Sequence, residues 1–486
     1  MTVFGNYIGG QWVSAKSGAT FERRNPADTR DCVGLFVQSS ARDVEEAVTA
    51  ARLALPGWRR LTPDARAQFF FKAAYRLLAR KEEIAAAITR EEGKSLAEAT
   101  SEAGRGAVLL RHFAGEGLRS GGEVLPSASP SAHVFTERVP LGVIGLITAW
   151  SFPLAIPLWK AASAMVYGNS VVLKPSPLSP HTAHLLAEIF HEAGLPPGVF
   201  NLVQGGAATG EALVACEPTL DGVSFTGSVA AGRLIAHAAI ERGTRYQLEM
   251  GSRNPVVILE DADLDQAVEL TVQGAMRSAG EQCTATARAI VVDGVADEFS
   301  RRVTERVKRL ELGPGTDPAA SLGPVISEEA RERILAHIAR ALSQGARLLC
   351  GGSAPADSER LKYGHYVLPT VLDHVQPTMA IAKEEVLGPV LAIVRVADFE
   401  AALRLANDVP FGLSATVFTR DIGAAFSFAR EAEAGMIRVN GEYAGVEPQA
   451  PSGGMKSSAS FSREQTQAAK DFFTRAKTVF MDKAGR

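Results

Sequence analysis

Short apolar runs alternate with amphipathic stretches through the middle of the chain. Four of the apolar runs occupy residues 143–147, 171–173, 200–203 and 223–225. Helical patterns stand among them, most clearly at 181–192 and 229–241. Strands that alternate with crossover helices are typical of a parallel sheet covered on both faces. A second series of this kind begins at 256–259 and continues past 289–292, so we predict two α/β domains, each with its own sheet.

The N-terminal part has a helical pattern from Asp43 to about Gly93. A second amphipathic run begins near Asp64, and Pro56 and Gly57 are predicted to separate the two helices. The apolar positions of the first helix share one face and are Val44, Val48, Ala51 and Leu55.

Three further segments complete the pattern. Residues 125–133 are rich in proline and serine and predict a loop or an excursion from the main body. The alternation at 472–481 predicts a terminal strand that can pair outside its own core. The longest apolar stretch, 141–159, contains Pro153 and Pro157, which favours a buried strand, a turn and a helix over a membrane span.

Composition and charge narrow the function classes. The chain has 486 residues, 46% of them hydrophobic, which is enough for more than one core. A net charge of -3 with both signs dispersed gives no electrostatic footprint for nucleic acid or for an anionic membrane. We therefore expect a small-molecule partner. Because residues 1–10 lack the basic start and apolar core of a signal peptide, we expect a reducing, cytoplasmic setting.

Among the cysteines, Cys283 has the surroundings that best suit a nucleophile. It stands in Gly280-Glu281-Gln282-Cys283-Thr284, between a glycine turn and an apolar run. Cys32, Cys216 and Cys350 are interpreted as packing or surface thiols. The four are far apart and form no C-x-x-C pair or Cys/His cluster, so no metal is expected and no disulfide framework is indicated. The place of Cys283 in the sequence does not by itself exclude a purely structural role for this residue.

Two turns at strand ends are candidates for binding a dinucleotide. Gly227 and Gly232 frame a G-x-x-x-x-G turn after the fourth apolar run, where amide groups and a helix dipole can face a phosphate. Lys174-Pro175-Ser176 follows the second run, at a carboxyl end where ligands of open α/β sheets bind. An ordinary strand-helix turn and a solvated loop lysine are the alternatives. Glu249 and Glu385 stand beside glycines and are either bases or exposed carboxylates.

Together these residues resemble the aldehyde dehydrogenase superfamily over nearly the whole chain. The motifs that carry the resemblance are Trp150-Ser151-Phe152-Pro153, Lys174-Pro175-Ser176, Phe225-Thr226-Gly227-Ser228, Glu249-Met250-Gly251, Gly280-Glu281-Gln282-Cys283, Glu385 to Pro389 and Gly453-Gly454-Met455-Lys456. Within it, the chain is most similar to the 2,5-dioxopentanoate (α-ketoglutarate semialdehyde) dehydrogenases of bacterial sugar-acid breakdown. The closer likeness is carried by Arg138-Val139-Pro140-Leu141-Gly142-Val143, Cys283-Thr284-Ala285-Thr286 and the tail from Gly445 through Ser462-Arg463-Glu464-Gln465 to Lys477-Thr478-Val479-Phe480.

The resemblance implies an α/β fold of the aldehyde dehydrogenase type. A Rossmann-type cofactor domain would comprise residues 1–121 and 141–251, and an α/β catalytic domain residues 252–448. A small β oligomerisation element would comprise 122–140 and 466–486. By the same resemblance we expect a homodimer or homotetramer.

The resemblance also implies roles for individual residues. Cys283 would attack an aldehyde and form a thioester, Glu249 would act as general base, and Lys160 would relay protons. NAD or NADP would be the cofactor, with Lys174 and Glu385 at the riboses and Gly227 and Ser228 at the pyrophosphate. The full set implied for the cofactor is Trp150, Lys174, Ser176, Gly206, Gly210, Gly227, Ser228, Gly251, Glu385 and Leu387.

For the substrate, the resemblance implies a tunnel bordered by Trp159. Arg277 lies six positions before Cys283, where relatives often place an aromatic residue, and it is the candidate partner of a substrate carboxylate. Arg111, on a helix expected to border the tunnel, is the second candidate. A surface salt bridge is the alternative for either arginine.

Several residues depart from the family pattern. Ser151 stands where the family normally has an asparagine that donates to the oxyanion, and loss of such a donor typically costs about 10²–10³ in rate. Pro177 stands where many NAD-preferring members carry a glutamate, so NADP is permitted. The other departures are Ser252 and Arg253 for the usual glycine and lysine, and Leu387 and Ser452 for common phenylalanines.

Two alternatives to 2,5-dioxopentanoate oxidation follow. A succinate or glutarate semialdehyde dehydrogenase would share every catalytic residue and differ in the length and polarity of the tunnel. A catalytically impaired relative that only binds the cofactor is the alternative suggested by Ser151, Ser252 and Ser452.

Overall fold

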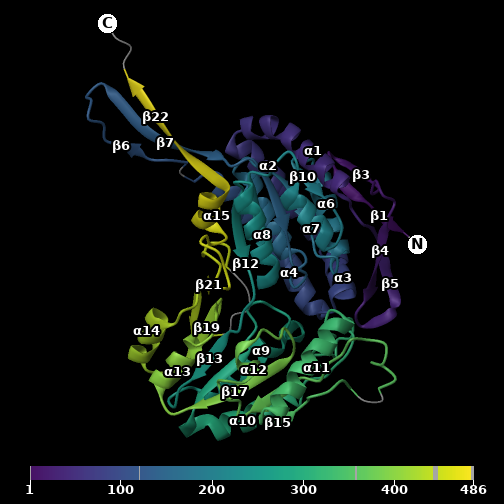
Figure 1. Ribbon diagram of the computed structural model, residues 1–486, viewed down its shortest axis with the longest axis vertical. Helices are drawn as coiled ribbons and strands as arrows, with labels where there is room; N and C mark the ends of the chain where they lie inside the picture. The colour runs from purple at the N-terminus through teal and green to yellow at the C-terminus, as the bar shows by residue number, and fades with distance from the viewer. Residues whose placement is uncertain (1, 120, 356–357, 442–446, 483–486) are drawn as a thin grey trace.

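The computed structural model describes residues 2–119, 121–355, 358–441 and 447–482. It shows two α/β lobes, one above the other in Figure 1, and an arm of three strands that projects from the upper lobe. Residues 1, 120, 356–357, 442–446 and 483–486, which fall within the predicted domains, lie outside the described residues.

A seven-stranded sheet forms the centre of the upper lobe. In order across the sheet, its strands are β12 (Arg245–Glu249), β11 (Gly222–Thr226), β8 (Val143–Ile147), β9 (Ser170–Lys174), β10 (Phe200–Leu202), β2 (Asn6–Ile8) and β3 (Gln11–Val13). The first five pair in parallel, whereas β2 and β3 continue the sheet in antiparallel pairs. The four predicted apolar runs are thus confirmed as β8, β9, β10 and β11.

Helices cover both faces of this sheet because its strands are apolar on both sides. Ile144 and Leu146 of β8 pack into one core, and Val143 and Ile147 into the other. The first core lies under α2 (Pro63–Ala79), α3 (Lys81–Glu92), α4 (Leu96–Glu116), α5 (Ala155–Val166) and α6 (Pro180–Glu192). The second lies under α1 (Ala41–Arg60), α7 (Ala207–Ala215) and α8 (Val229–Glu241). The predicted buried strand, turn and helix at 141–159 are confirmed by β8 and α5.

Pro56 and Gly57 lie inside α1, so the prediction that they separate two helices is wrong. Tertiary contacts hold the last turn helical although Pro56 cannot donate a backbone hydrogen bond. Trp58 is 1% exposed, and its Nε1 donates to the carbonyl oxygen of Met165 at 2.9 Å. The break comes later, where Thr62 accepts from the backbone N–H of Ala65 and starts α2.

The lower lobe repeats the architecture with a second seven-stranded sheet. Its strands, in order, are β15 (Arg347–Cys350), β16 (Thr370–Asp373), β17 (Val390–Val396), β14 (Arg288–Val292), β13 (Pro255–Ile258), β19 (Ser414–Phe418) and β20 (Met436–Val439). One face packs on α9 (Leu264–Met276) and α10 (Asp293–Val307). The other packs on α11 (Glu328–Ser343), α12 (Ala380–Lys383), α13 (Phe399–Asn407) and α14 (Ile422–Glu431). The predicted second strand-helix series is confirmed.

The arm is an antiparallel sheet built from distant segments. Its strands are β22 (Thr474–Asp482), β7 (Ala132–Pro140) and β6 (Val124–Leu125), in that order. The preceding helix α15 (Thr466–Phe473) packs into the upper core through Ala469, Phe472 and Phe473. The terminal strand therefore begins at Thr474, and β22 is an edge strand whose Phe480 is 69% exposed.

Smaller strands complete the described chain. An N-terminal sheet, which the sequence patterns did not predict, contains β1 (Val3–Phe4), β5 (Asp28–Val37) and β4 (Thr20–Asn25). A two-stranded ribbon pairs β18 (Phe411–Gly412) with β21 (Met455–Lys456). Within the described ranges, no helix is both long enough and apolar enough to cross a bilayer. Those ranges likewise hold no group of three or more His, Cys, Asp or Glu side chains placed to bind a metal ion.

Replacement of Trp58 by alanine tests the packing of α1. Trp58→Ala is expected to lower the free energy of unfolding by about 3–5 kcal/mol, because it removes a buried ring from the upper core. Leu53→Ala in the same helix, where the side chain is 77% exposed, is the control and should change it by less than about 0.5 kcal/mol. Equal losses in urea denaturation of the two variants would contradict this assignment.

Candidate active site

Cys283 follows a left-handed turn that the backbone makes after α9. In the turn η1 (Arg277–Gly280), φ is 47° at Ser278, 53° at Ala279 and 68° at Gly280. A Cβ at Gly280 would lie 2.1 Å from the carbonyl oxygen of Gly388, so only glycine fits there. Non-glycine residues in this region are strained, and such strain is concentrated at functional sites.

Glu98 of α4 holds this turn from the other lobe. The backbone N–H of Ser278 donates to Oε1 of Glu98 at 2.9 Å, and Nε of Arg277 lies 3.7 Å from the same oxygen. Nε2 of Gln282 donates to Oγ of Ser278 at 2.8 Å. The position of Cys283 therefore depends on a contact between the lobes.

The carbonyl oxygen of Cys283 is fixed by two side chains. Oγ of Ser252 donates to it at 2.5 Å and Nδ2 of Asn254 at 2.8 Å. The backbone N–H of Ser252 donates to Oε1 of Glu385 at 2.7 Å. A glycine at position 252 would lack the first of these bonds, so the serine that departs from the family pattern adds an anchor for Cys283.

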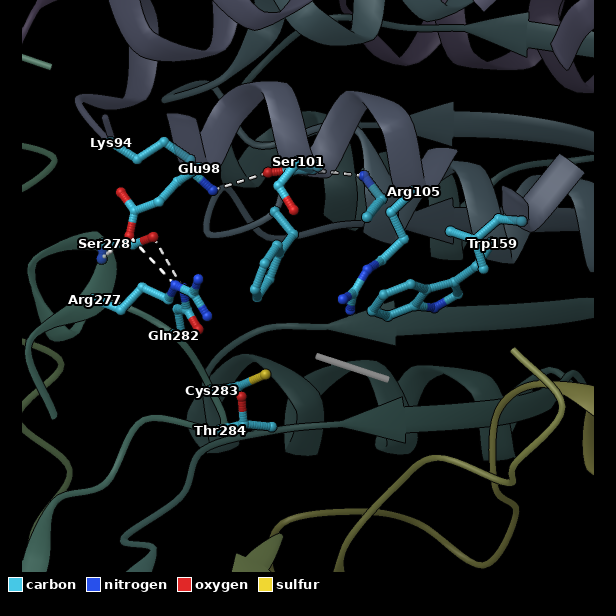
Figure 2. Close-up of a pocket in the computed structure, with 14 residues that line it drawn as sticks. Lys94, Glu98, Ser101, Arg105, Trp159, Arg277, Ser278, Gln282, Cys283 and Thr284 are labelled. Carbon is cyan, nitrogen blue, oxygen red and sulfur yellow. Dashed lines mark hydrogen bonds and ion pairs between the residues drawn. The ribbon is translucent and has the colours of Figure 1, made fainter. Parts of the chain in front are cut away.

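Two cavities meet at Cys283. The first, which we call the α4 cavity, has a volume of about 330 Å³ and is drawn in Figure 2. Its walls contain Lys94, Glu98, Ser101, Glu102, Arg105, Leu109, Phe152, Ala155, Trp159, Arg277, Ser278, Gln282, Cys283 and Thr284. The second, the α8 cavity, has a volume of about 410 Å³ and extends to the Gly227 turn at the start of α8. Cys283 lines both, which would allow its thiol to meet a molecule in either.

Most of the residues expected at the site line one of these cavities. Those in the α8 cavity are Trp150, Ser151, Gly227, Ser228, Gly251, Glu385 and Leu387. Trp159 and Arg277 line the α4 cavity. Arg111 is exposed on α4 and is not among the residues that line either cavity.

A further group of expected residues lies at the carboxyl end of β9, outside the lining of the α8 cavity. Lys174 is buried there, and its Nζ donates to the carbonyl oxygen of Gly205 at 3.3 Å. Gly206 caps α7, and a Cβ at Gly210 would lie 3.6 Å from Cδ of Lys174. Ser176, two residues after Lys174, is also buried, and its Oγ accepts a hydrogen bond from the backbone N–H of Leu178.

Glu249 is a buried carboxylate at the end of β12. Its Oε2 accepts from the backbone N–H of Gly454 at 3.3 Å, and its Oε1 has no hydrogen-bond partner. Burial, followed by the charge of Glu464, raises the pKa of Glu249 well above the usual value, against the opposing effect of Lys160. A raised pKa suits a general base that must also release its proton near neutral pH.

Glu464 forms an ion pair with Lys160 that the sequence patterns did not predict. The pair is buried, and Nζ of Lys160 also donates to Oγ of Ser224 at 2.8 Å. Oε2 of Glu464 accepts from Nε1 of Trp159 at 3.0 Å. Lys160 and Glu464 thus link the wall of the α4 cavity to the surroundings of Glu249.

The surroundings of Cys283 favour the protonated thiol. Desolvation, followed by the charges of Glu249, Glu385 and Glu464, raises the pKa of Cys283 to about 12. The thiol is therefore protonated at neutral pH, and its reaction requires a base or an added positive charge.

The α8 cavity fits a polar ligand such as a dinucleotide. Two buried atoms in its wall, Oγ1 of Thr226 and Oε1 of Glu281, have no hydrogen-bond partner. Oγ of Ser228 accepts from the backbone N–H of Ala231 and caps α8, whose N-terminus opens toward the cavity lining. A helix N-terminus favours a phosphate through its amide groups and its dipole.

Comparison with known proteins agrees with this geometry. The model of the aldehyde dehydrogenase family matches residues 12–479. The chain is 48% identical to "Alpha-ketoglutaric semialdehyde dehydrogenase" of Bacillus subtilis over 98% of its length and 97% of that protein's. It is 39% identical to "Alpha-ketoglutarate semialdehyde dehydrogenase" of Haloferax volcanii, with 98% of each chain covered.

Solved structures give the same result. A structure described as an E. coli NADP dependent enzyme superposes with a TM-score of 0.94 at 34% identity and covers 98% of each chain. NAD-dependent aldehyde dehydrogenase from Sinorhizobium meliloti gives 0.95 at 34% identity and covers 99% of this chain and 95% of its own. The chain belongs to the aldehyde dehydrogenase family, which confirms the predicted fold class. Within it, the protein is an NAD(P)-dependent aldehyde dehydrogenase.

The pKa of Cys283 can be tested by alkylation. In the cofactor-free protein, its reaction with iodoacetamide should accelerate roughly tenfold per pH unit between about pH 7 and about pH 9 without a plateau, because the thiolate is the reactive form. Glu249→Gln removes a carboxylate whose charge raises the pKa of the thiol and should therefore speed the reaction. Mass spectrometry measures the label, and Cys283→Ala gives the background. Slower alkylation of Glu249→Gln would contradict the charge effect.

Proposed function

We propose that the chain oxidises 2,5-dioxopentanoate to 2-oxoglutarate with NADP or NAD. The observation that carries the proposal is the α4 cavity, which has the thiol of Cys283 and the guanidinium of Arg277 in its walls (Figure 2). An aldehyde with a distal carboxylate suits that pair, because arginine binds carboxylates through charge-assisted hydrogen bonds. The names of the relatives from Bacillus subtilis and Haloferax volcanii support the same substrate.

The first proposed step forms a thiohemiacetal on Cys283. The sulfur attacks the aldehyde carbon, and the carbonyl oxygen becomes an oxyanion. Glu249 is the proposed acceptor of the thiol proton, since its pKa is raised and its charge acts on that thiol. The backbone N–H of Cys283 and the hydroxyl of Ser151 are the proposed donors to the oxyanion.

The second step releases the acid. A nicotinamide bound at this site would supply the hydride acceptor, and loss of hydride from the thiohemiacetal would leave a thioester on Cys283. After passing on the thiol proton, Glu249 takes a proton from a water molecule that attacks the thioester carbon. The C–S bond then breaks, the acid leaves, and the sulfur recovers a proton from Glu249 to become the thiol again. Lys160, paired with Glu464, is the proposed route by which the proton leaves Glu249.

The α8 cavity is the proposed site of the nicotinamide half of the cofactor. Glu385 and Lys174 would hold the two riboses, and Gly227 and Ser228 the pyrophosphate. Ser176, Gly206 and Gly210 would border the adenosine end. Because Pro177 provides no carboxylate to repel a 2′-phosphate, we expect both cofactors to be used, with NADP at least competitive.

Domain roles and assembly follow from the same family likeness. We propose that residues 1–121 and 141–251 bind the cofactor and that 252–448 supply the nucleophile. The arm would join subunits in a dimer or tetramer. The exposed apolar residues of β22, among them Phe480 and Met481, support pairing at this unpaired edge.

A panel of semialdehydes tests the proposed function. We expect a higher kcat/KM for 2,5-dioxopentanoate than for succinate semialdehyde, and comparable kcat/KM values for NADP and NAD, followed by absorbance of the reduced cofactor. Cys283→Ala should abolish turnover and retain cofactor binding, measured by calorimetry. A preference for succinate semialdehyde would reject the substrate, and exclusive use of NAD would reject the cofactor assignment.

A substitution at Ser151 tests its place beside the oxyanion. Ser151→Asn supplies the longer amide donor of the family pattern and should raise the pre-steady-state rate of cofactor reduction about tenfold to hundredfold. Ser151→Ala measures what the hydroxyl itself contributes. If the asparagine variant is no faster than the serine protein, Ser151 does not occupy a position that can serve the oxyanion.

A further inference from the structure

One face of α4 forms a wall of the α4 cavity. Its residues recur three or four positions apart, as neighbours on a helix do, and are Glu98, Ser101, Glu102, Arg105 and Leu109. Arg105 therefore brings a second guanidinium to the cavity, besides that of Arg277. Arg111 comes six residues later, about one and two-thirds turns, and leaves this face.

Two other charged groups of the wall, Lys94 and Glu102, bind to each other and to the backbone. Nζ of Lys94 donates to Oε2 of Glu102 at 2.9 Å and to the carbonyl oxygen of Ser151 at 3.0 Å. Oε1 of Glu102 in turn accepts from two backbone N–H groups at the start of α5. Lys94 and Glu102 thus hold the loop of Ser151 in place.

The two arginines reach the cavity from different lobes. Figure 2 shows Arg105 descending from α4 and Arg277 entering from the turn before Cys283, with their side chains directed toward the space above Cys283. Arg277 also faces Glu98 at 3.7 Å, which offsets part of its positive charge. The same cavity also has apolar wall residues, Leu109, Phe152 and Trp159. They suit the methylene groups between an aldehyde and a distal charge.

We infer that Arg105 is a specificity-determining residue that binds the distal carboxylate of the substrate together with Arg277. This inference rests on the proposed function, because it assigns the carboxylate-binding residues of the same site. A 2-oxo acid presents a ketone oxygen beside its carboxylate, and two guanidinium groups can donate to all three oxygens. Arg105 thereby selects anionic aldehydes over neutral ones of equal length.

Three aldehydes of five carbons separate the contributions. Pentanal is neutral, 5-oxopentanoate adds the carboxylate, and 2,5-dioxopentanoate adds the ketone. For Arg105→Met, kcat/KM for 5-oxopentanoate should fall about tenfold to hundredfold, as expected for loss of a hydrogen bond to a charged group. The value for pentanal should be unchanged or higher, which also shows that the variant is folded. Arg105→Lys should recover part of the loss, since it retains the charge and loses the fork.

The remaining variants decide between the arginines. Arg277→Met should show the same selective loss of kcat/KM for 5-oxopentanoate. Arg111→Met, which alters the other arginine of α4, should show no such selective loss. Equal losses for pentanal and 5-oxopentanoate in Arg105→Met, or a selective loss in Arg111→Met instead, would overturn the inference. If the unaltered enzyme prefers 5-oxopentanoate to 2,5-dioxopentanoate, the proposed substrate fails while the effect of Arg105 is still measured by the first two aldehydes. An enzyme that prefers pentanal to 5-oxopentanoate would overturn the role of Arg105 itself.

Discussion

The left-handed turn at residues 278–280 is the constraint on which the site depends. Without it, the chain leaving α9 would not place Cys283 between the two cavities. Two features hold the strained backbone: the carboxylate of Glu98, which comes from the upper lobe, and the close approach of Gly280 to Gly388 within the lower lobe. Cys283 is therefore positioned by the junction of the lobes, and a displacement of α4 relative to the lower sheet would displace its sulfur.

The same junction concentrates carboxylates around the sulfur. Glu249, Glu385 and Glu464 all raise the pKa of Cys283, and burial raises the pKa of Glu249 and Glu385 as well. Burial and neighbouring carboxylate charge thus favour the protonated forms of Cys283 and Glu249. A thiol kept protonated is a poor target for adventitious oxidation or alkylation. Cys283 would become reactive once a positive charge or a proton acceptor lies beside its thiol. The electrostatics of the site thus bear on the order of the chemical steps.

Features with a local signal were predictable from the sequence, and those that depend on distant contacts were not. The strands β8 and β9 follow from apolar runs, and the motif around Cys283 lies within a few residues of Arg277. The sequence wrongly predicts a helix boundary at Pro56, because the burial of Trp58, a tertiary contact, outweighs the local penalty of proline. Glu98 binds Ser278, 180 residues away, and Glu464 binds Lys160, 304 residues away. Which arginine of α4 lines the cavity, Arg105 or Arg111, depends on which face of the helix is turned toward it, and only the structure shows this.

The departures from the family pattern bear on whether the chemistry is retained. A site that has lost its function is expected to accumulate side chains without partners, because nothing selects their contacts. Here the hydroxyl of Ser252 anchors the carbonyl oxygen of Cys283, and Nη2 of Arg253 donates to the carbonyl oxygen of Ile381. Oγ of Ser452 contacts the sulfur of Met436 at 3.7 Å. Ser252, Arg253 and Ser452 each make a polar contact within the protein, so these three departures are compatible with a site that retains its chemistry.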